Sequence, residues 1–269
     1  MRHRNKPLIA TIRKGDSGGD TSSLDRGFEV LRAFRSGEKT LAIGDVAQRL
    51  SIRKALAQSL VDTLVSEHLL RQVGNTDRYQ PDVGCFLLGH AWLAVSEIAQ
   101  AARPRMQQFA KKFGLNIVLG AHHGLDIICI ESCSNLVPVH TPVMIGLTVP
   151  VTATALGRAW LWAQPATTQG EIIQRAKIER GEEGVNTIPG VYRAFQEMEE
   201  FGYCYSSGEW MKHVSAIGTV IVLKDGTSFG LCCDLPEPGI DENFLRTDLG
   251  PAFLKAALTI KSDAEQMKE

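Results

Sequence analysis

The sequence predicts an α+β protein: an N-terminal winged helix-turn-helix, then an apolar linker helix, then a domain built on a mainly antiparallel sheet. Three observations predict it. Residues 41–64 have the spacing of two short amphipathic helices separated by a tight turn. From about residue 103, strand patterns alternate with helix patterns. Residues 1–85 hold 14 Lys and Arg against 10 Asp and Glu, whereas residues 86–269 hold 15 against 20. A basic front end joined to an acidic body is typical of a nucleic-acid-binding module attached to a second domain.

Length and composition exclude several classes of protein. A chain of 269 residues with 44% apolar and 22% charged residues is ordinary for one large globular domain or two smaller ones. The apolar runs fall short of the roughly 18 residues that span a bilayer, and the basic N-terminus lacks the apolar segment of a secretory signal. Six cysteines without a CxxC pair indicate reduced thiols. We therefore expect a cytoplasmic protein with no membrane partner.

The first 22 residues are predicted to be a disordered basic tail, because they are rich in Gly and Ser and lack an apolar period. A helix then opens at Ser23, which is placed to cap its N-terminus, and ends at Ser36-Gly37-Glu38. Its apolar side chains pack on the next helix to complete a three-helix core.

Residues 41–64 carry the helix-turn-helix pattern. The first helix aligns four apolar side chains on one face: Ile43, Val46, Ala47 and Leu50. After a break at Ser51-Ile52, the second helix buries a similar set: Ala57, Leu60, Val61 and Leu64. Its polar, partly basic outer face has the character of a recognition helix that enters the major groove.

The segment from Leu69 to Pro81 reads as two short strands around a Gly-Asn-Thr-Asp turn. A hairpin here is a wing, and it places Arg78 where a phosphate can be met. The alternative interpretation is a small helical bundle with an ordinary hairpin, because helix pairs are common.

Residues 83–102 are predicted to form a linker helix whose apolar side chains are too numerous for a solvated connector. Such a helix needs a partner surface, and a second copy of the chain is the economical choice. Pro104 is expected to start the next helix, which ends near Gly114.

The remaining chain is read as strands at 116–122, 125–132, 137–151, 203–205, 216–223 and 228–233, and as helices at 152–163, 171–180, 191–201 and 241–261. Helices on one side of a mainly antiparallel sheet are expected from this order.

Four stretches in this order resemble the IclR family of bacterial transcriptional regulators. Ser23 to Leu31 is similar to the family's opening helix, and Leu41 to Tyr79 to its winged helix-turn-helix. Ile145 to Ala159 resembles the family's signature after a glycine loop. In that signature a hydrophobic residue and Pro are followed, after two residues, by Ala and Thr or Ser, and then, after two more, by Gly, by Lys or Arg, and by Ala. Gly208-Glu209-Trp210 and Val214 to Ile217 resemble a hairpin of the family's effector domain.

The resemblance covers about residues 23–261 and implies three parts: a DNA-binding domain over 23–82, a dimerising linker over 83–102 and a GAF-like effector-binding domain over 103–269. It implies a homodimer or homotetramer on double-stranded operator DNA, with a small-molecule effector, typically a carboxylate. It leaves open whether the protein represses or activates; repression of a catabolic operon is our preferred interpretation.

One departure from the family concerns the recognition helix. Many members begin it with Ser-Thr and carry an Arg four positions after that Ser, whereas this chain has Ala55, Leu56 and Ser59. An altered operator sequence is one interpretation. A helix-turn-helix that no longer binds DNA and acts through protein contacts is the other.

Candidate DNA contacts are cationic or hydroxyl side chains at helix starts and on the wing. Gln can bind adenine and Arg can bind guanine through two hydrogen bonds each, and cations meet phosphates. The predicted set is Arg26, Thr40, Arg53, Lys54, Gln58, Ser59 and Arg78.

Candidate effector contacts follow from the resemblance. They lie at a helix start near Thr152 to Leu156, where unpaired N–H groups suit a carboxylate, and on the strands that face it. The predicted set is Ala155, Leu156, Ser206, Ser207, Ala216, Cys232 and Asp234. Asp234 suits an anion only if it faces a hydroxyl or amine of the ligand, or solvent.

No metal, cofactor or catalytic site is predicted. His122 and His123 are adjacent on a strand and point to opposite faces, so a turn is favoured over a metal site. A redox sensor on Cys129, Cys133 or Cys232 has no support. The sequence shows no nucleophile elbow, paired His/Cys motif or phosphate loop, so the protein is not expected to be an enzyme.

Overall fold

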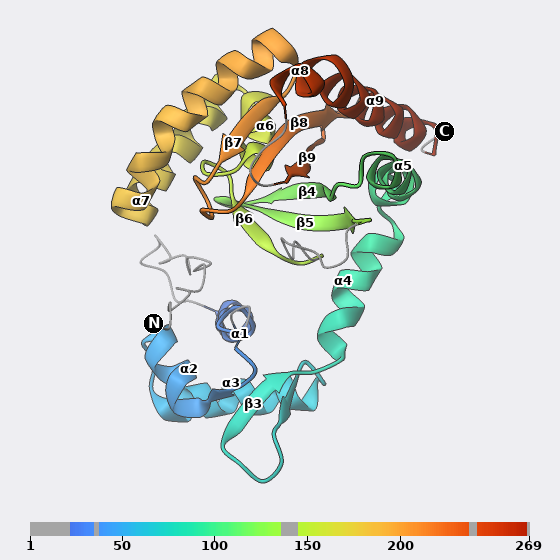
Figure 1. Ribbon diagram of the computed structural model, residues 1–269. Helices are drawn as coiled ribbons and strands as arrows, with labels where there is room; N and C mark the ends of the chain where they lie inside the picture. Colours follow the sequence, from blue (N-terminus) through green and yellow to red (C-terminus); the bar gives the residue numbers. More distant parts are fainter. Residues whose placement is uncertain (1–21, 35–37, 136–144, 237–240, 268–269) are drawn as a thin grey trace. The chain divides into compact units, whose positions relative to one another are not determined.

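The computed structural model describes residues 22–34, 38–135, 145–236 and 241–267, which form two compact units divided between Val95 and Ser96 (Figure 1). Almost all of the predicted tail, and most of the β-rich stretch expected at 137–151, lie outside the described residues. The first unit contains α1 Ser23–Arg32, β1 Leu41–Ala42, α2 Ile43–Leu50, α3 Lys54–Ser66, β2 Leu70–Gln72, β3 Arg78–Pro81 and α4 Gly84–Ala94.

Helix α1 is capped one residue earlier than predicted. The Ser22 hydroxyl accepts a hydrogen bond from the Asp25 N–H at 3.1 Å, and the Asp25 carboxylate accepts one from the Ser22 N–H at 3.2 Å. This reciprocal capping box requires the acidic side chain three residues after the cap, which favours Ser22 over Ser23. The expectation for Ser23 was wrong.

The helix-turn-helix prediction is confirmed. Ser51 ends α2 in the left-handed conformation with φ 54°, and the Ile52 N–H donates to the Ala47 carbonyl at 3.0 Å, which closes the turn. Helix α3 buries the expected apolar face against α1 and α2. The core of this unit comprises Val30, Ala33, Leu41, Ile43, Val46, Ala57, Leu60, Val61, Leu64, Leu70 and Tyr79.

The wing contains one more strand than predicted. The expected hairpin forms from β2 and β3, and β1 pairs with the other edge of β3, so the antiparallel order is β1-β3-β2. A strand of two residues is too short to show an alternating pattern.

The apolar segment predicted as one linker helix is divided between two. Helix α4 buries none of its residues, whereas α5 Glu97–Phe113 buries Ile98, Ala101 and Ala102 in the core of the second unit. Pro104 lies inside α5 rather than at its start, so that expectation was wrong. In the described residues no single helix meets the length and apolarity needed to cross a bilayer; α4 and α5 do so only when taken together across their break.

The second unit is built on a six-stranded sheet. Its strands are β4 Ile117–His123, β5 Asp126–Cys133, β6 Thr148–Pro150, β7 Cys204–Ser207, β8 Ser215–Val222 and β9 Ser228–Leu235, in the order β6-β5-β4-β9-β8-β7. Every neighbouring pair is antiparallel. The predicted α+β class with an antiparallel sheet is confirmed.

Helices cover both faces of this sheet, which corrects the expectation of one side (Figure 1). Helices α5 and α9 Gly250–Gln266 pack on one face. Helix α9 follows the short α8 Glu242–Phe244 and a π-helical turn at Leu245–Leu249. Helices α6 Ala155–Trp162 and α7 Ala166–Phe201 cover the other face. Alternation sorts the side chains: Ile117 and Leu119 of β4 point to the first face and Val118 to the second.

Helix α6 approaches the sheet closely because glycines lie beneath it. A Cβ atom on Gly218 of β8 would collide with the Ala155 carbonyl, and one on Gly230 of β9 would lie 2.7 Å from the Leu156 carbonyl oxygen. Backbone therefore packs directly on backbone at the start of α6.

Helix α7 is longer than its predicted pieces. It includes a break at Gly181, where φ is 57° and ψ is −132°, and it passes through Pro189. Its buried residues between these two points, Gly184, Thr187 and Ile188, show that tertiary packing holds a segment whose composition favours a loop.

Candidate functional site

The N-terminus of α3 is an open, positively charged helix end. Arg53 is the N-cap residue and Lys54 the first helical residue, and both are exposed. No side chain caps this end, and no acidic residue lies in the first turn. Since helix N-termini carry partial positive charge and free N–H groups, this uncapped end, where Ala55 supplies no hydroxyl, leaves backbone donors that suit a phosphate.

Gln58 and Ser59 lie one turn further along α3. Ser59 is exposed, whereas Gln58 is half-buried and its amide donates to Asp62 at 2.8 Å. One N–H of the Gln58 amide is therefore engaged within α3, and its second N–H and its oxygen are the groups left for a base edge.

The structure joins two of the predicted phosphate contacts. The Arg78 Nε donates to the Thr40 hydroxyl at 2.7 Å, and an Arg78 terminal nitrogen donates to the Thr40 carbonyl at 3.1 Å. These bonds fix the guanidinium on the β1–β3 edge of the wing. Arg26 lies in the first turn of α1 and is half-buried.

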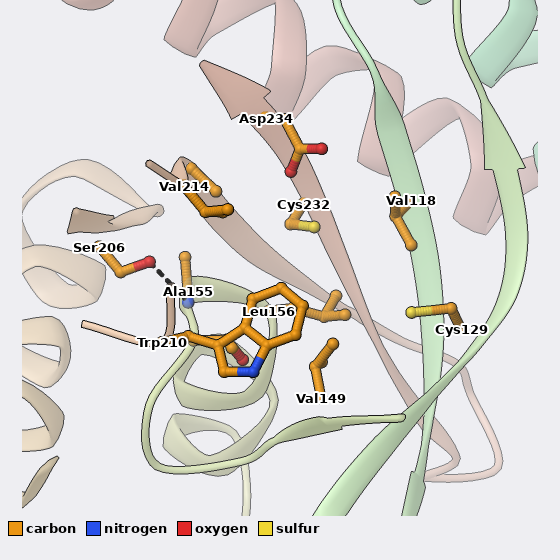
Figure 2. Close-up of a pocket in the computed structure, with 12 residues that line it drawn as sticks. Val118, Cys129, Val149, Ala155, Leu156, Ser206, Trp210, Val214, Cys232 and Asp234 are labelled. Carbon is orange, nitrogen blue, oxygen red and sulfur yellow. Dashed lines mark hydrogen bonds between the residues drawn. The ribbon is translucent and has the colours of Figure 1, made fainter. Parts of the chain in front are cut away.

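A small cavity lies in the second unit between the start of α6 and the sheet, with a volume of about 30 Å³ (Figure 2). It has room for about two water molecules. The lining residues are Val118, Cys129, Val149, Thr154, Ala155, Leu156, Ser206, Trp210, Val214, Ala216, Cys232 and Asp234. Six of the seven predicted effector contacts are in this set.

Ser207 is the exception. Successive side chains of a strand point to opposite faces, so Ser206 faces the cavity and Ser207 does not. The Ser207 hydroxyl lies 2.8 Å from that of Ser215 and is exposed.

The start of α6 is more fully satisfied than the sequence suggested. The Ala155 N–H donates to the Ser206 hydroxyl at 3.1 Å, shown as a dashed line in Figure 2, and the Gly157 N–H donates to the Thr154 hydroxyl at 3.1 Å. The expected row of unpaired N–H groups was therefore wrong for these two donors. A carboxylate at this end must share or replace the Ser206 hydroxyl.

Asp234 is the acidic group of the lining. Its carboxylate accepts a hydrogen bond from the Asn116 amide at 2.8 Å. Burial raises the pKa of Asp234 from its ordinary value of 3.8 to about 6, and the Asn116 bond opposes the rise only in part. The lining contains no Lys, Arg or His, so nothing cationic in the cavity balances this carboxylate.

Asp234→Asn is expected to stabilise the protein more at high pH than at low pH. Because the pKa of the native carboxyl is raised, the native state binds more protons than the unfolded state between about pH 4 and pH 6, and wild-type stability falls as the pH rises through this window. The neutral amide removes that loss, by about 1–2 kcal/mol above pH 7. Thermal unfolding of both proteins at about pH 4.5 and pH 8 measures it. Asp77→Asn, at an exposed position, is the control; an equal gain at both pH values would contradict the expectation.

Sequence reasoning missed Trp210 and Val214 as cavity residues, although both lie in the quoted hairpin motif. It missed Val118, Cys129, Val149 and Thr154 as well. Strand alternation gives the face of Val118, but which face carries a cavity depends on where α6 packs.

A half-buried ion pair between Arg158 and Glu209 joins α6 to the segment after β7. Arg158 is 0% exposed, and its guanidinium donates twice to Glu209, at 3.0 and 2.6 Å, and to the Thr152 carbonyl at 2.8 Å. Arg193 of α7 also donates to Glu209 at 2.6 Å. Burial acts to raise the pKa of Glu209, but the bonds and charges of Arg158 and Arg193 outweigh it, so the pKa is lowered.

The cysteines of the second unit are buried thiols. All six cysteines are free, and burial raises the pKa of Cys129 and Cys204 to about 12 and that of Cys133 to about 11. A protonated, buried thiol is a poor nucleophile and a poor redox sensor. Among the described residues no group of three or more His, Cys, Asp or Glu side chains is arranged to hold a metal ion.

Comparison with known proteins gives a consistent result over both units. The family model of the IclR helix-turn-helix domain matches residues 23–74, and that of the C-terminal domain of bacterial IclR transcriptional regulators matches residues 90–230. The chain is 25% identical over 248 residues to the HTH-type transcriptional regulator TsaQ1/TsaQ2 of Comamonas testosteroni. The matched region covers 91% of this chain and 89% of that protein.

Two solved structures are similar along almost the whole chain. An IclR family transcriptional regulator from Brucella abortus has a TM-score of 0.84 and 29% identity, covering 96% of this chain and 99% of that one. An IclR homolog from Microbacterium hydrocarbonoxydans, complexed with 4-hydroxybenzoate, has a TM-score of 0.71 and 18% identity, covering 91% and 100%. The second likeness is one of fold.

Proposed function

Because this chain belongs to the IclR family of bacterial transcriptional regulators, we propose that it is a ligand-responsive regulator that binds operator DNA and senses a small organic or aromatic acid. The observation that carries the DNA-binding half is the N-terminus of α3, which presents Arg53, Lys54 and uncapped backbone to solvent. We assign the protein regulation rather than catalysis, in the cytoplasm where its operator lies.

On DNA, α3 enters the major groove and the wing lies along the backbone. Arg53 and Gln58 bind base edges, with Ser59 beside them, and Lys54, Arg26 and the Thr40–Arg78 pair contact phosphates. The fixed guanidinium of Arg78 supports this role, because a side chain already held by Thr40 loses little conformational entropy on binding.

The cavity is the proposed effector site. Its walls are mostly apolar and suit a hydrocarbon ring, with polar atoms at separate points. A ligand carboxylate is accommodated at the start of α6, where the Ser206 hydroxyl and the helix end supply donors, and a ligand hydroxyl donates to Asp234. The 4-hydroxybenzoate bound by the Microbacterium homolog has both groups, which supports this class of ligand.

Regulation requires two DNA-binding units, which we attribute to a homodimer or homotetramer joined through α4. Operators of this kind are palindromic, and two half-sites must be met at a set spacing. A ligand that binds one arrangement of the dimer more tightly than another shifts the population between them. We assign the protein as a repressor of a catabolic operon. In this role the compound that the operon degrades binds the protein and causes it to dissociate from the operator.

Binding to the DNA upstream of the protein's own gene, against a random duplex at two salt concentrations, tests the proposal. Arg53→Ala and Gln58→Ala are each expected to weaken specific binding by about 5- to 100-fold with little effect on the random duplex. Lys54→Ala is expected to weaken both and to flatten the salt dependence by about one unit. Lys111→Ala, at an exposed position of α5, is the control.

Equal affinity for both duplexes in the wild type would contradict specific operator reading at this site. Absence of any salt-dependent complex would favour the second candidate, a ligand-binding protein whose helix-turn-helix acts through protein contacts. That candidate arises from Ala55, Leu56 and Ser59, which replace the family's usual residues.

A further inference from the structure

Trp210 lines the cavity, and its indole is the largest side chain among the lining residues. Figure 2 shows the indole ring lying among Leu156, Val149 and Val214, with Asp234 beyond it. With the ring in place, the space that remains holds about two water molecules and no aromatic acid. A ligand with a ring therefore needs lining side chains to move, and the indole occupies more of this space than any other.

The indole N–H of Trp210 has no hydrogen-bond partner. Across the described ranges it is the single buried side-chain nitrogen or oxygen atom in that condition. Buried polar groups in native proteins are almost always paired, because an unpaired donor has lost its bond to water without gaining another. The closed position of the ring is therefore disfavoured by this unsatisfied donor, which a movement toward solvent or toward a ligand oxygen would relieve.

The backbone that carries Trp210 is held on both sides. The Gly208 N–H donates to the Val214 carbonyl at 2.9 Å, which closes the base of the segment between β7 and β8. Glu209 is fixed by its bonds to Arg158 and Arg193. Since the neighbouring residues are anchored, the freedom that remains at this position is rotation of the Trp210 side chain.

We propose that Trp210 is a movable cover of the effector cavity and that its indole N–H donates to an oxygen of the bound ligand. The ligand is a flat aromatic compound that carries a carboxylate, takes the space that the ring vacates and packs against the indole face. This assignment rests on the proposed function only in treating the cavity as the effector site.

Hydrogen exchange of the four indole N–H groups in the free full-length protein, followed by ¹⁵N NMR, tests the movement. The structure supplies two internal references: Trp92 is 44% exposed and Trp160 is 4% exposed. If the cover opens, the buried Trp210 N–H exchanges at least about tenfold faster than that of Trp160. Exchange as slow as that of Trp160 would overturn the movable cover. Trp210→Phe assigns the signal.

Addition of benzoate, benzenesulfonate or toluene to the same sample tests the ligand class. The two oxygen-bearing probes are expected to shift the Trp210 indole signal downfield, and toluene, which lacks an acceptor, is not. In Trp210→Phe, which keeps a ring and removes the donor, benzoate affinity is expected to fall about tenfold while toluene affinity is retained. No downfield shift with either oxyanion, or an equal loss for benzoate and toluene, would overturn the assigned bond.

These measurements contain no DNA, so their outcome is independent of operator binding. A protein that fails to bind its upstream DNA but shows the exchange and the shifts retains the ligand site and loses the proposed regulatory function. The reverse result retains the regulator and removes Trp210 from its mechanism.

Discussion

Arg158→Met is expected to lower the free energy of unfolding by about 2–3 kcal/mol, at or below the lower end of the range for a fully buried ion pair, because Glu209 is partly exposed and keeps Arg193. The guanidinium is fully buried and satisfies Glu209 and the Thr152 carbonyl together. Gly190 of α7 leaves room for it, since a Cβ there would collide with the guanidinium. Methionine fills much of the volume, so the loss measures the unpaired acceptors rather than an empty cavity. Thermal and urea unfolding of the full chain measure it.

Two variants sharpen the interpretation. Arg158→Lys keeps the charge but cannot bind the carboxylate through two parallel bonds, so an intermediate loss is expected. Arg175→Met removes an exposed pair with Glu179 on α7 and is expected to cost less than about 0.5 kcal/mol. If Arg158→Met proved no more costly than Arg175→Met, the half-buried pair would have no structural role.

Leu87→Glu with Leu88→Glu is expected to convert the proposed dimer or tetramer to a monomer at micromolar concentration. Six large apolar side chains on and beside α4 are 44–73% exposed: Val83, Phe86, Leu87, Leu88, Trp92 and Val95. An apolar surface of this kind on a helix that buries nothing within its own unit is typical of an interface. Two carboxylates placed in it would have to be buried on assembly, which costs more than the apolar contacts return.

Sedimentation equilibrium measures the change in mass, and operator binding should fall with it, because the proposed dimer binds two linked half-sites together. Leu258→Glu is the matched control, since Leu258 of α9 is 68% exposed and distant in sequence from α4. Retention of the wild-type mass by the double variant would exclude α4 as the surface that joins the copies.

The elements that the sequence predicted well are those whose pattern repeats over several turns. The apolar spacing of α2 and α3 is unbroken, and β8 and β9 are almost continuously buried runs on either side of a turn. The misses fall where local composition and tertiary packing disagree. Pro104 and Pro189 favour helix ends, yet both lie inside helices whose neighbouring residues are buried. The amino-acid sequence alone does not show that tertiary packing buries these neighbouring residues.

The candidate site divides in the same way. Ser206, Ala216 and Cys232 are cavity residues because strand alternation aims them at α6, which a motif can anticipate. Ser207 was assigned beside Ser206 although adjacent strand residues face opposite ways. The position of Trp210 depends on the turn at Gly208 and on the bonds that Glu209 forms with Arg158 and Arg193. The two arginines lie on helices α6 and α7, far from Trp210 in sequence.

The glycines beneath α6 limit how this binding site can diverge. Gly218 and Gly230 hold the backbone of α6 against two strands, so any larger residue at either position lifts the helix and loses the cavity. When a new inducer is selected for, in nature or in a biosensor library, the substitutions that are tolerated are therefore those at other cavity-lining side chains, not at these two glycines. Positions 210 and 214, on the segment opposite, are where substitution can change the range of recognised compounds while the fold is preserved.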